Sequence, residues 1–126
     1  MTKSVIREKS FLFALEIIEL FKKFQAGHEY ILSKQLLRSG TSIGANIEEA
    51  LAGQSRKDFL AEMAVTSKET RETRYWLVLL QESGLAKIEL NPVLKNIDEL
   101  IRILTSIVKT TAENPVIQNS KLKTQN

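Results

Sequence analysis

Apolar residues recur along this chain at the three- and four-residue spacing of an amphipathic helix, and no segment alternates strictly as a half-buried strand does. The apolar stripes predict four helices, over residues 10–24, 29–52, 55–83 and 91–114. Short connections of this kind are typical of consecutive helices that lie antiparallel. The pattern therefore predicts an all-α protein folded as an up-down antiparallel four-helix bundle.

The ends of these segments carry residues that favour helix starts and stops. Gly53 can adopt the left-handed conformation that closes a helix, and Ser55 can cap the helix that follows. Gly84 can end the third helix, and Pro92 suits the first turn of the fourth, where its missing N–H costs no hydrogen bond. The chain accordingly divides into a basic N-terminal segment, the bundle and a loose polar C-terminal tail, over residues 1–9, 10–114 and 115–126.

The middle of the third helix, from Thr66 to Arg74, contains no large apolar side chain, although both ends of that helix are strongly apolar. The second helix is also unusual in its centre, because Gly40 and Gly44 lie one turn apart and each costs a helix about 1 kcal/mol relative to alanine. Close approach of another helix is the usual compensation. Antiparallel packing would place these glycines opposite the polar stretch. We expect a polar helix–helix seam formed by Gly40, Gly44, Asn46, Glu49, Ser67 and Arg71.

The same region allows a second interpretation, a phosphate-binding surface. The candidate nucleic-acid-binding residues are Arg56, Lys57, Lys68, Arg71 and Arg74. Acidic residues such as Glu69 and Glu72 interrupt this set, lower its local field and can pair with the basic side chains within the helix. The residues therefore favour a structural network over phosphate binding, and both interpretations stay open.

The net charge of +3 is concentrated outside the predicted bundle. Residues 1–9 and 115–126 carry +2 each, so residues 10–114 carry −1. Because the bundle itself is not basic, affinity for RNA or DNA would depend on local clusters, on the ends of the chain, or on repetition of both around an oligomer.

Residue types that commonly perform catalysis are scarce. The 126 residues include no cysteine and one histidine, His28, which excludes a thiolate site, a multi-histidine zinc site and the paired Glu-x-x-His motifs of di-iron bundles. Glu49 and Glu72 could form a carboxylate pair for acid–base work, but nearby arginines favour ion pairing. We expect no catalytic residue, no metal and no cofactor.

The apolar runs are too short for a membrane protein. None approaches the roughly 20 residues needed to span a bilayer. Glu16 and Glu19 interrupt the first apolar stretch, which argues against a signal peptide. We expect a cytoplasmic protein without membrane contact.

The apolar run that ends the third helix is wider than one core face requires. Tyr75 and Trp76 are adjacent and point about 100° apart on a helix, so both cannot face the core centrally. Aromatic residues are favoured anchors of subunit interfaces. The candidate subunit interface is therefore Tyr75, Trp76 and Leu79, although full coverage within one wide bundle face is the alternative.

Two segments resemble a known family. The first contains a Ser-Ile-x-x-Asn-Ile-x-Glu element at Ser42, Ile43, Asn46, Ile47 and Glu49. The second contains a Lys-Glu-x-x-Glu-Thr-x-Tyr-Trp-Leu element at Lys68, Glu69, Glu72, Thr73, Tyr75, Trp76 and Leu77. Over about residues 10–112, their order and spacing resemble the four-helix bundle proteins encoded by intervening sequences of 23S ribosomal RNA genes.

This resemblance implies a bacterial bundle that assembles into a homopentamer. It also implies relatives that serve as accessory proteins of diversity-generating retroelements, and those relatives are basic and associate with nucleic acid and a reverse transcriptase. We interpret the chain as a noncatalytic oligomeric four-helix bundle, with nucleic-acid binding as an accessory or scaffold protein as its leading activity. The alternative is a protein–protein interaction module without a role in nucleic-acid binding.

Overall fold

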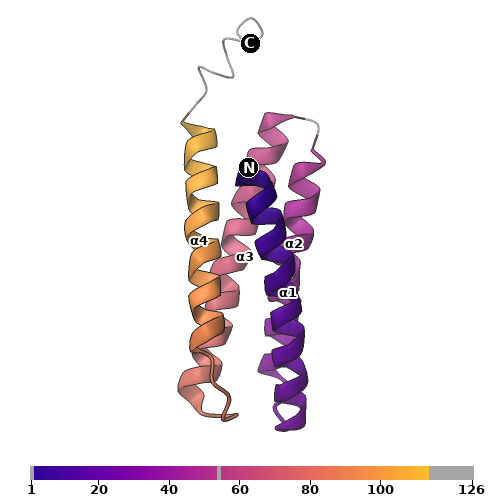
Figure 1. Ribbon diagram of the computed structural model, residues 1–126, viewed down its shortest axis with the longest axis vertical. Helices are drawn as coiled ribbons and strands as arrows, with labels where there is room; N and C mark the ends of the chain where they lie inside the picture. Colours follow the sequence, from indigo (N-terminus) through magenta and orange to yellow (C-terminus); the bar gives the residue numbers. More distant parts are fainter. Residues whose placement is uncertain (1, 54, 114–126) are drawn as a thin grey trace, which may run out of the picture.

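The computed structural model describes residues 2–53 and 55–113, and this part of the chain forms four helices and no strand. The helices are α1 (Thr2–Ala26), α2 (Leu32–Leu51), α3 (Arg56–Ser83) and α4 (Asn91–Ala112). In Figure 1, α1 and α3 run downward while α2 and α4 run upward, joined by short loops at alternating ends. The prediction of an all-α, up-down antiparallel four-helix bundle is confirmed.

The first helix begins at Thr2 rather than at residue 10, so residues 2–9 extend the bundle. Ile6 is fully buried in the core. Arg7 Nε lies 2.8 Å from Glu48 Oε2 of α2, and Lys9 Nζ lies 3.2 Å from Glu99 Oε2 of α4. Two basic residues expected in a separate segment are therefore paired with acidic residues of neighbouring helices. The polar tail expected at residues 115–126 lies outside the described residues.

The core extends along the bundle between the four helices. Its largest fully buried side chains come from every helix: Ile6, Ile17, Phe24, Leu36, Ile43, Ile47, Met63, Leu77, Leu80, Ile97, Leu100 and Leu104. Helix α2 packs closely on both α3 and α1, whereas α1 and α4 pack least closely of the adjacent pairs. The boundary between α1 and α4 is consequently the more open side of the bundle.

Both ends of α3 follow the expected capping chemistry. Ser55 Oγ accepts a hydrogen bond of 3.0 Å from the Asp58 N–H, and Gly84 closes α3 with a φ of +66°. Helix α2 differs from the prediction at both ends, because it begins at Leu32 rather than at Glu29 and ends at the cap residue Ala52, with a φ of −89°. The expected left-handed conformation of Gly53 is therefore wrong, since Gly84 is the glycine with a positive φ among the described residues. The buried Glu29 carboxylate accepts the N–H groups of Ile31, Leu32 and Ser33 at 3.1, 2.9 and 2.7 Å, so it occupies the position of a cap.

Candidate functional site

The polar centre of α3 is buried, and its hydroxyl groups are satisfied within the bundle. Thr66, Thr70 and Thr73 are fully buried. Each Oγ1 donates to a carbonyl of the preceding turn, at 2.6 to 2.8 Å. The hydroxyls of Thr73 and Ser39, on α3 and α2, are also hydrogen-bonded at 3.0 Å. A buried threonine can satisfy its hydroxyl group by donating to a carbonyl of its own helix. A sequence of polar residues can therefore occupy the core.

The two glycines of α2 pack against α1, so the prediction that they face the polar stretch of α3 is wrong. A Cβ added to Gly40 would lie 2.9 Å from Ile17 Cγ1, and one added to Gly44 would lie 3.4 Å from the Ser10 carbonyl oxygen. Both contacts belong to α1. Glycine therefore permits close approach of α1 and α2, while Ser39 and Thr73 make a buried polar contact between α2 and α3. Spacing alone predicted a close helix contact but could not specify which neighbour makes it.

The other residues of the expected seam are separated from one another. Arg71 is exposed, and its Nη2 donates to Thr105 Oγ1 of α4 at 3.3 Å. Asn46 and Ser67 are half-buried, whereas Glu49 is exposed. Within the described residues, no hydrogen bond or ion pair connects Asn46 or Glu49 with Arg71. The six residues therefore do not form one network.

Three of the five candidate nucleic-acid-binding residues contact α4. Arg56 donates to the Thr111 carbonyl oxygen, Arg74 Nε lies 2.6 Å from Asp98 Oδ1, and Arg71 contacts Thr105 as described above. The two lysines in the set, Lys57 and Lys68, are exposed. The three arginines thus join α3 to α4. The two lysines are the members of this set whose charges are more accessible to a ligand.

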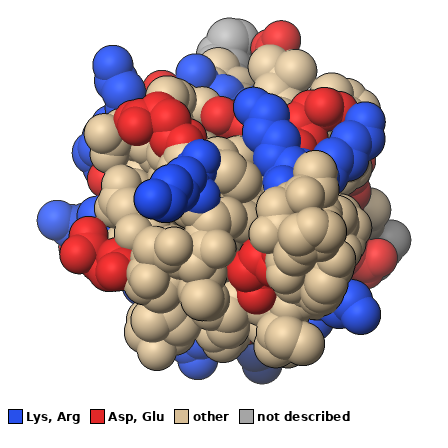
Figure 2. Space-filling model, turned by 90° about the horizontal axis from the view of Figure 1, so that it is seen from below, with Lys and Arg blue, Asp and Glu red and all other residues tan. Residues whose placement is uncertain are grey.

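Charges of both signs are interleaved on the end of the bundle that carries the α1–α2 and α3–α4 loops. Figure 2 shows basic and acidic side chains next to one another there, separated by uncharged surface. Opposite charges this close partly cancel each other's field at the distance of a bound polyanion. This end offers no broad basic surface to a nucleic acid.

A polar cluster on α2 and α3 escaped the sequence analysis. Arg38 of α2 forms an ion pair with Glu72 of α3, and Glu72 also accepts a hydrogen bond of 3.0 Å from Trp76 Nε1. Burial raises the pKa of the nearby Glu69 carboxyl, the negative charge of Glu72 raises it further, and Arg38 opposes the increase. Glu69 and Glu72 lie one turn apart, which is the signal that could have revealed the cluster.

The aromatic pair on α3 is divided between core and surface. Trp76 packs against the core and is half-buried, while Tyr75 is 59% exposed. Their rings meet edge to face, with centroids 5.3 Å apart. Leu79 is half-buried. The role of Tyr75, Trp76 and Leu79 as a subunit interface stays a prediction.

Helix α1 is apolar on two opposite sides, a feature that the sequence analysis missed. Phe13, Ile17, Leu20 and Phe24 face the core. The outward ridge consists of Val5 (43% exposed), Phe11 (63%), Leu12 (54%), Leu15 (46%) and Ile18 (38%). These outward positions recur at intervals of three, four and seven residues, so they share one face of the helix. The spacing of these residues in the sequence carried that signal, but spacing alone does not show which stripe of a helix faces the core.

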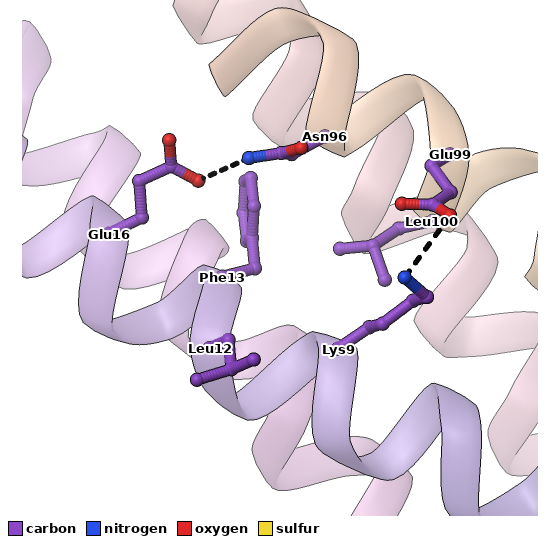
Figure 3. Close-up of a pocket in the computed structure, with 7 residues that line it drawn as sticks. All are labelled: Lys9, Leu12, Phe13, Glu16, Asn96, Glu99 and Leu100. Atoms are coloured by element: carbon purple, nitrogen blue, oxygen red, sulfur yellow. Dashed lines mark hydrogen bonds and ion pairs between the residues drawn. The ribbon is translucent and has the colours of Figure 1, made fainter. Parts of the chain in front are cut away.

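Two grooves flank this ridge. The groove between α1 and α4 has a volume of about 150 Å³ and is lined on its apolar side by Leu12, Phe13 and Leu100. Figure 3 shows the Lys9–Glu99 ion pair at one end of it and the Asn96–Glu16 hydrogen bond of 2.8 Å at the other. The opposite groove, between α1 and α2, measures about 230 Å³. Phe11 lines it, together with the small residues Ser10, Ala14, Thr41, Gly44 and Ala45.

The described helices offer neither a metal site nor a membrane span. Among residues 2–53 and 55–113, no three histidine, cysteine, aspartate or glutamate side chains gather where they could hold a metal ion. Over the same ranges, no helix combines the length and apolar character that crossing a lipid bilayer requires. The ridge and grooves of α1 are therefore the surface features that invite a functional explanation.

These features define the class of the protein as a small all-α four-helix bundle with an exposed apolar helix face. The sequence model of the 23S rRNA-intervening sequence protein family matches residues 2–106. The chain therefore belongs to that family.

A solved relative agrees with this assignment. It is a protein of unknown function from Bacteroides thetaiotaomicron, described as a member of the S23 ribosomal protein family. The two chains are 41% identical with a TM-score of 0.82, and the match covers 86% of this chain and 99% of the relative. No curated protein matches the chain.

Proposed function

We propose that this protein is a noncatalytic scaffold that assembles with copies of itself, using the outward face of α1 as an interaction surface. The observation that carries this proposal is the exposed ridge of five large apolar side chains on α1. Contiguous apolar patches beyond a few hundred Å² are rare on monomers and mark interaction sites. Burying the ridge against another subunit would remove this apolar surface from water at about 25 cal/mol per Å².

The expected homopentamer and the bacterial cytoplasm belong to this proposal as implications of family membership. The exposed Tyr75 supports a second subunit contact on α3, because an aromatic ring is an efficient interface anchor. Two separate contact surfaces on one chain are what closed rings and larger assemblies require. A pair of distinct apolar surfaces is therefore compatible with a ring.

Nucleic-acid binding, as an accessory or scaffold protein, is the second candidate. It is supported by the exposed Lys57 and Lys68, which form no ion pair with another described residue. Repetition of these lysines around an oligomer would raise their local density. The ion pair or hydrogen bond that each candidate arginine makes within the bundle weighs against a large basic surface.

One experiment separates the two candidates. Light scattering on the purified chain gives its mass in solution, and the ratio of absorbance at the nucleic-acid and protein maxima reports co-purified nucleic acid. A scaffold without nucleic acid should give a mass above 14.3 kDa, a protein-like spectrum and little dependence on salt. Phosphate binding should instead weaken steeply as salt rises, because each contact releases counterions. A monomer at every salt concentration would refute the scaffold.

A further inference from the structure

We propose that the groove between α1 and α4 is the binding site for a segment of the same chain, residues 114–126, called the C-terminal segment below. The segment follows the last described residue and lies beyond residues 2–106, which the family model matches. The contact is therefore a property of this chain rather than of the fold that the family shares. Because it is intramolecular, it goes beyond the proposed self-association and does not depend on it.

The groove has an apolar floor, formed where the two adjacent helices pack least closely. Phe13 and Leu100 line it from the core side, and Leu12, which is 54% exposed, lines its outer edge. Figure 3 shows these three side chains between the two polar ends of the groove. The volume of about 150 Å³ is below the roughly 300 Å³ of a typical small-molecule site. The groove therefore suits one inserted aliphatic side chain better than a bound metabolite.

Each end of the groove carries a carboxylate. Glu99 Oε2 lies 3.2 Å from Lys9 Nζ at one end, and Glu16 Oε1 accepts a hydrogen bond of 2.8 Å from Asn96 at the other. A carboxylate offers about four acceptor positions, so each of these groups can accept a further N–H donor. One lysine and two glutamates give the lining a net charge of −1. The groove therefore attracts a positively charged segment.

The C-terminal segment has the complementary pattern. Leu122 stands between Lys121 and Lys123, and residues 114–126 contain no acidic residue. Neighbouring side chains of an extended chain point to opposite sides, so Leu122 can enter the groove while both lysines remain at its rim. Their long side chains can then bring an ammonium group to the carboxylate at either end. The order of lysine, leucine and lysine matches the order of carboxylate, apolar floor and carboxylate.

The segment is long enough to reach the groove. Helix α1 begins and α4 ends at the same end of the bundle (Figure 1). Leu100 lies thirteen residues before Glu113 on α4, a distance of about 20 Å at the rise of a helix. Leu122 follows Glu113 by nine residues, which span up to about 30 Å when extended. Pro115 disfavours continuation of α4, and the surplus length allows the chain to turn back.

An apolar strip connects the groove with the end of α4. Ile103 and Ile107 follow Leu100 by three and seven positions, so they share its side of the helix. Both are half-buried and pack against the core. Val116 and Ile117, directly after the proline, are the residues of the segment that can reach this strip first. The path from α4 to the groove is thus apolar in both the bundle and the segment.

The covalent connection favours the chain's own segment over any other occupant. A short linker gives a tethered group an effective concentration of about millimolar, so a weak site fills without a second molecule. Another protein would have to supply the same pattern of lysine, leucine and lysine at a comparable concentration. The occupied groove covers the α4 side of Leu12 and leaves Phe11, which lines the opposite groove, available to another subunit.

Disulfide trapping tests the contact, because the chain contains no cysteine. Thr124 follows Leu122 by two residues, which brings it toward the end of the groove that Asn96 forms. The full chain carrying Asn96→Cys and Thr124→Cys should therefore form a disulfide within one chain under mild oxidation. Mass spectrometry of the denatured protein and of its proteolytic peptides distinguishes this product from a covalent dimer.

Val65→Cys combined with Thr124→Cys is the matched control. Val65 is 49% exposed on α3, six positions before Arg71, which contacts Thr105 of α4. It is thus nearer than Asn96 to the end of α4, so a freely moving segment would meet Val65 at least as often.

The proposal predicts a clear difference between the two pairs. The Asn96 pair should form its disulfide at least about tenfold faster than the Val65 pair, because a docked segment raises the local concentration of one thiol at the other. Adding Leu122→Ser should lower the rate of the Asn96 pair to that of the control. Equal rates for the two pairs, an unchanged rate with Leu122→Ser, or disulfides that join two copies would overturn the proposal. A monomeric wild-type chain would refute self-association and leave this contact standing.

Discussion

The hydroxyl groups of Ser39 and Thr73 meet at 3.0 Å in the core, where α2 packs on α3. Both side chains are fully buried, and this is the hydrogen bond that the Ser39 side chain makes among the described residues. A buried polar group left without its partner costs more than the hydrogen bond contributes when it is made. The pair is therefore strongly coupled.

Removing one hydroxyl should accordingly cost more than removing both. Thr73→Val should lower the free energy of unfolding by about 1–3 kcal/mol, because it strands the Ser39 hydroxyl in the core. Adding Ser39→Ala to it should recover part of the loss. Urea denaturation of the two single variants and the double variant measures the coupling. Strictly additive effects would show that the two hydroxyls do not depend on each other.

The two glycines of α2 should respond differently to substitution by alanine. Gly40→Ala should lower the free energy of unfolding by about 1–3 kcal/mol, because its Cβ would meet Ile17 Cγ1 and Cγ2 at 2.9 and 3.1 Å. Ile17 is β-branched and cannot swing these atoms away freely. Gly44→Ala, the control, meets its nearest atom at 3.4 Å, so the gain in helix propensity should leave it neutral or up to about 1 kcal/mol more stable. Equal losses at both sites would contradict this account of the α1–α2 contact.

The Glu29 carboxylate should make part of the stability dependent on pH. Burial raises its pKa, but the hydrogen bonds from Leu32, Ser33 and Ile31 outweigh burial, and the net pKa is lowered. A carboxyl whose pKa is lower in the folded state than in the unfolded state stabilises the fold at pH values above its unfolded-state pKa. That contribution is lost as the pH falls through the folded-state pKa.

Glu29→Gln should therefore be less stable than the wild type by about 1–3 kcal/mol at pH 7. The difference should shrink as the pH falls below about 4, near the pKa of an unperturbed glutamate. Urea denaturation of both proteins between pH 7 and pH 2.5 gives the comparison. A difference that stays constant with pH would show that the charge of Glu29 contributes nothing.

Glu69 should show the opposite dependence. Burial and the neighbouring Glu72 raise its pKa, so ionisation of Glu69 opposes folding. This destabilisation appears as the pH rises through the pKa of Glu69 in the unfolded state, and it is absent at lower pH. Glu69→Gln should then be equally stable or more stable at pH 7, by about 0.5 kcal/mol, and indistinguishable from the wild type near pH 3.

Glu72→Gln is the control for this cluster. It weakens the ion pair with Arg38, so it should destabilise the protein at pH 7. The Glu69→Gln and Glu72→Gln substitutions, one helical turn apart, are thus expected to change the free energy of unfolding with opposite signs. Loss of stability in the Glu69 variant at pH 7 would contradict the assigned environment.

The fold was predictable from the sequence because each helix carries a stripe of apolar residues and recognisable ends. Ser55 and Gly84 mark the limits of α3 as their chemistry requires. The beginning of α1 was not predictable in the same way, since the buried Ile6 is followed directly by the charged residues Arg7, Glu8 and Lys9. Its burial depends on α1 running beside α2 and α4, which is a tertiary contact.

The candidate site was harder to predict for a similar reason. The absence of a Cβ at Gly40 and Gly44 indicated a close helix neighbour, but the sequence contained no information that selected α1 over α3. Arg71 and Arg74 could reach several helices, and the structure directs both to α4. The outward stripe of α1 could be recognised from the helical spacing of its residues. Its exposure depended on packing, which determines the side of α1 that faces the core.

The most direct test of the central claim is the mass in solution of a variant in which the α1 ridge is made polar. Leu15→Glu introduces charge at the centre of the ridge without altering a core position, and Val65→Glu makes the same change on the exposed surface of α3. Light scattering should give an oligomer for the wild type and the Val65 variant. The Leu15 variant should show a smaller assembly with its helical content unchanged. An undiminished mass for the Leu15 variant would contradict the claim that α1 joins the subunits.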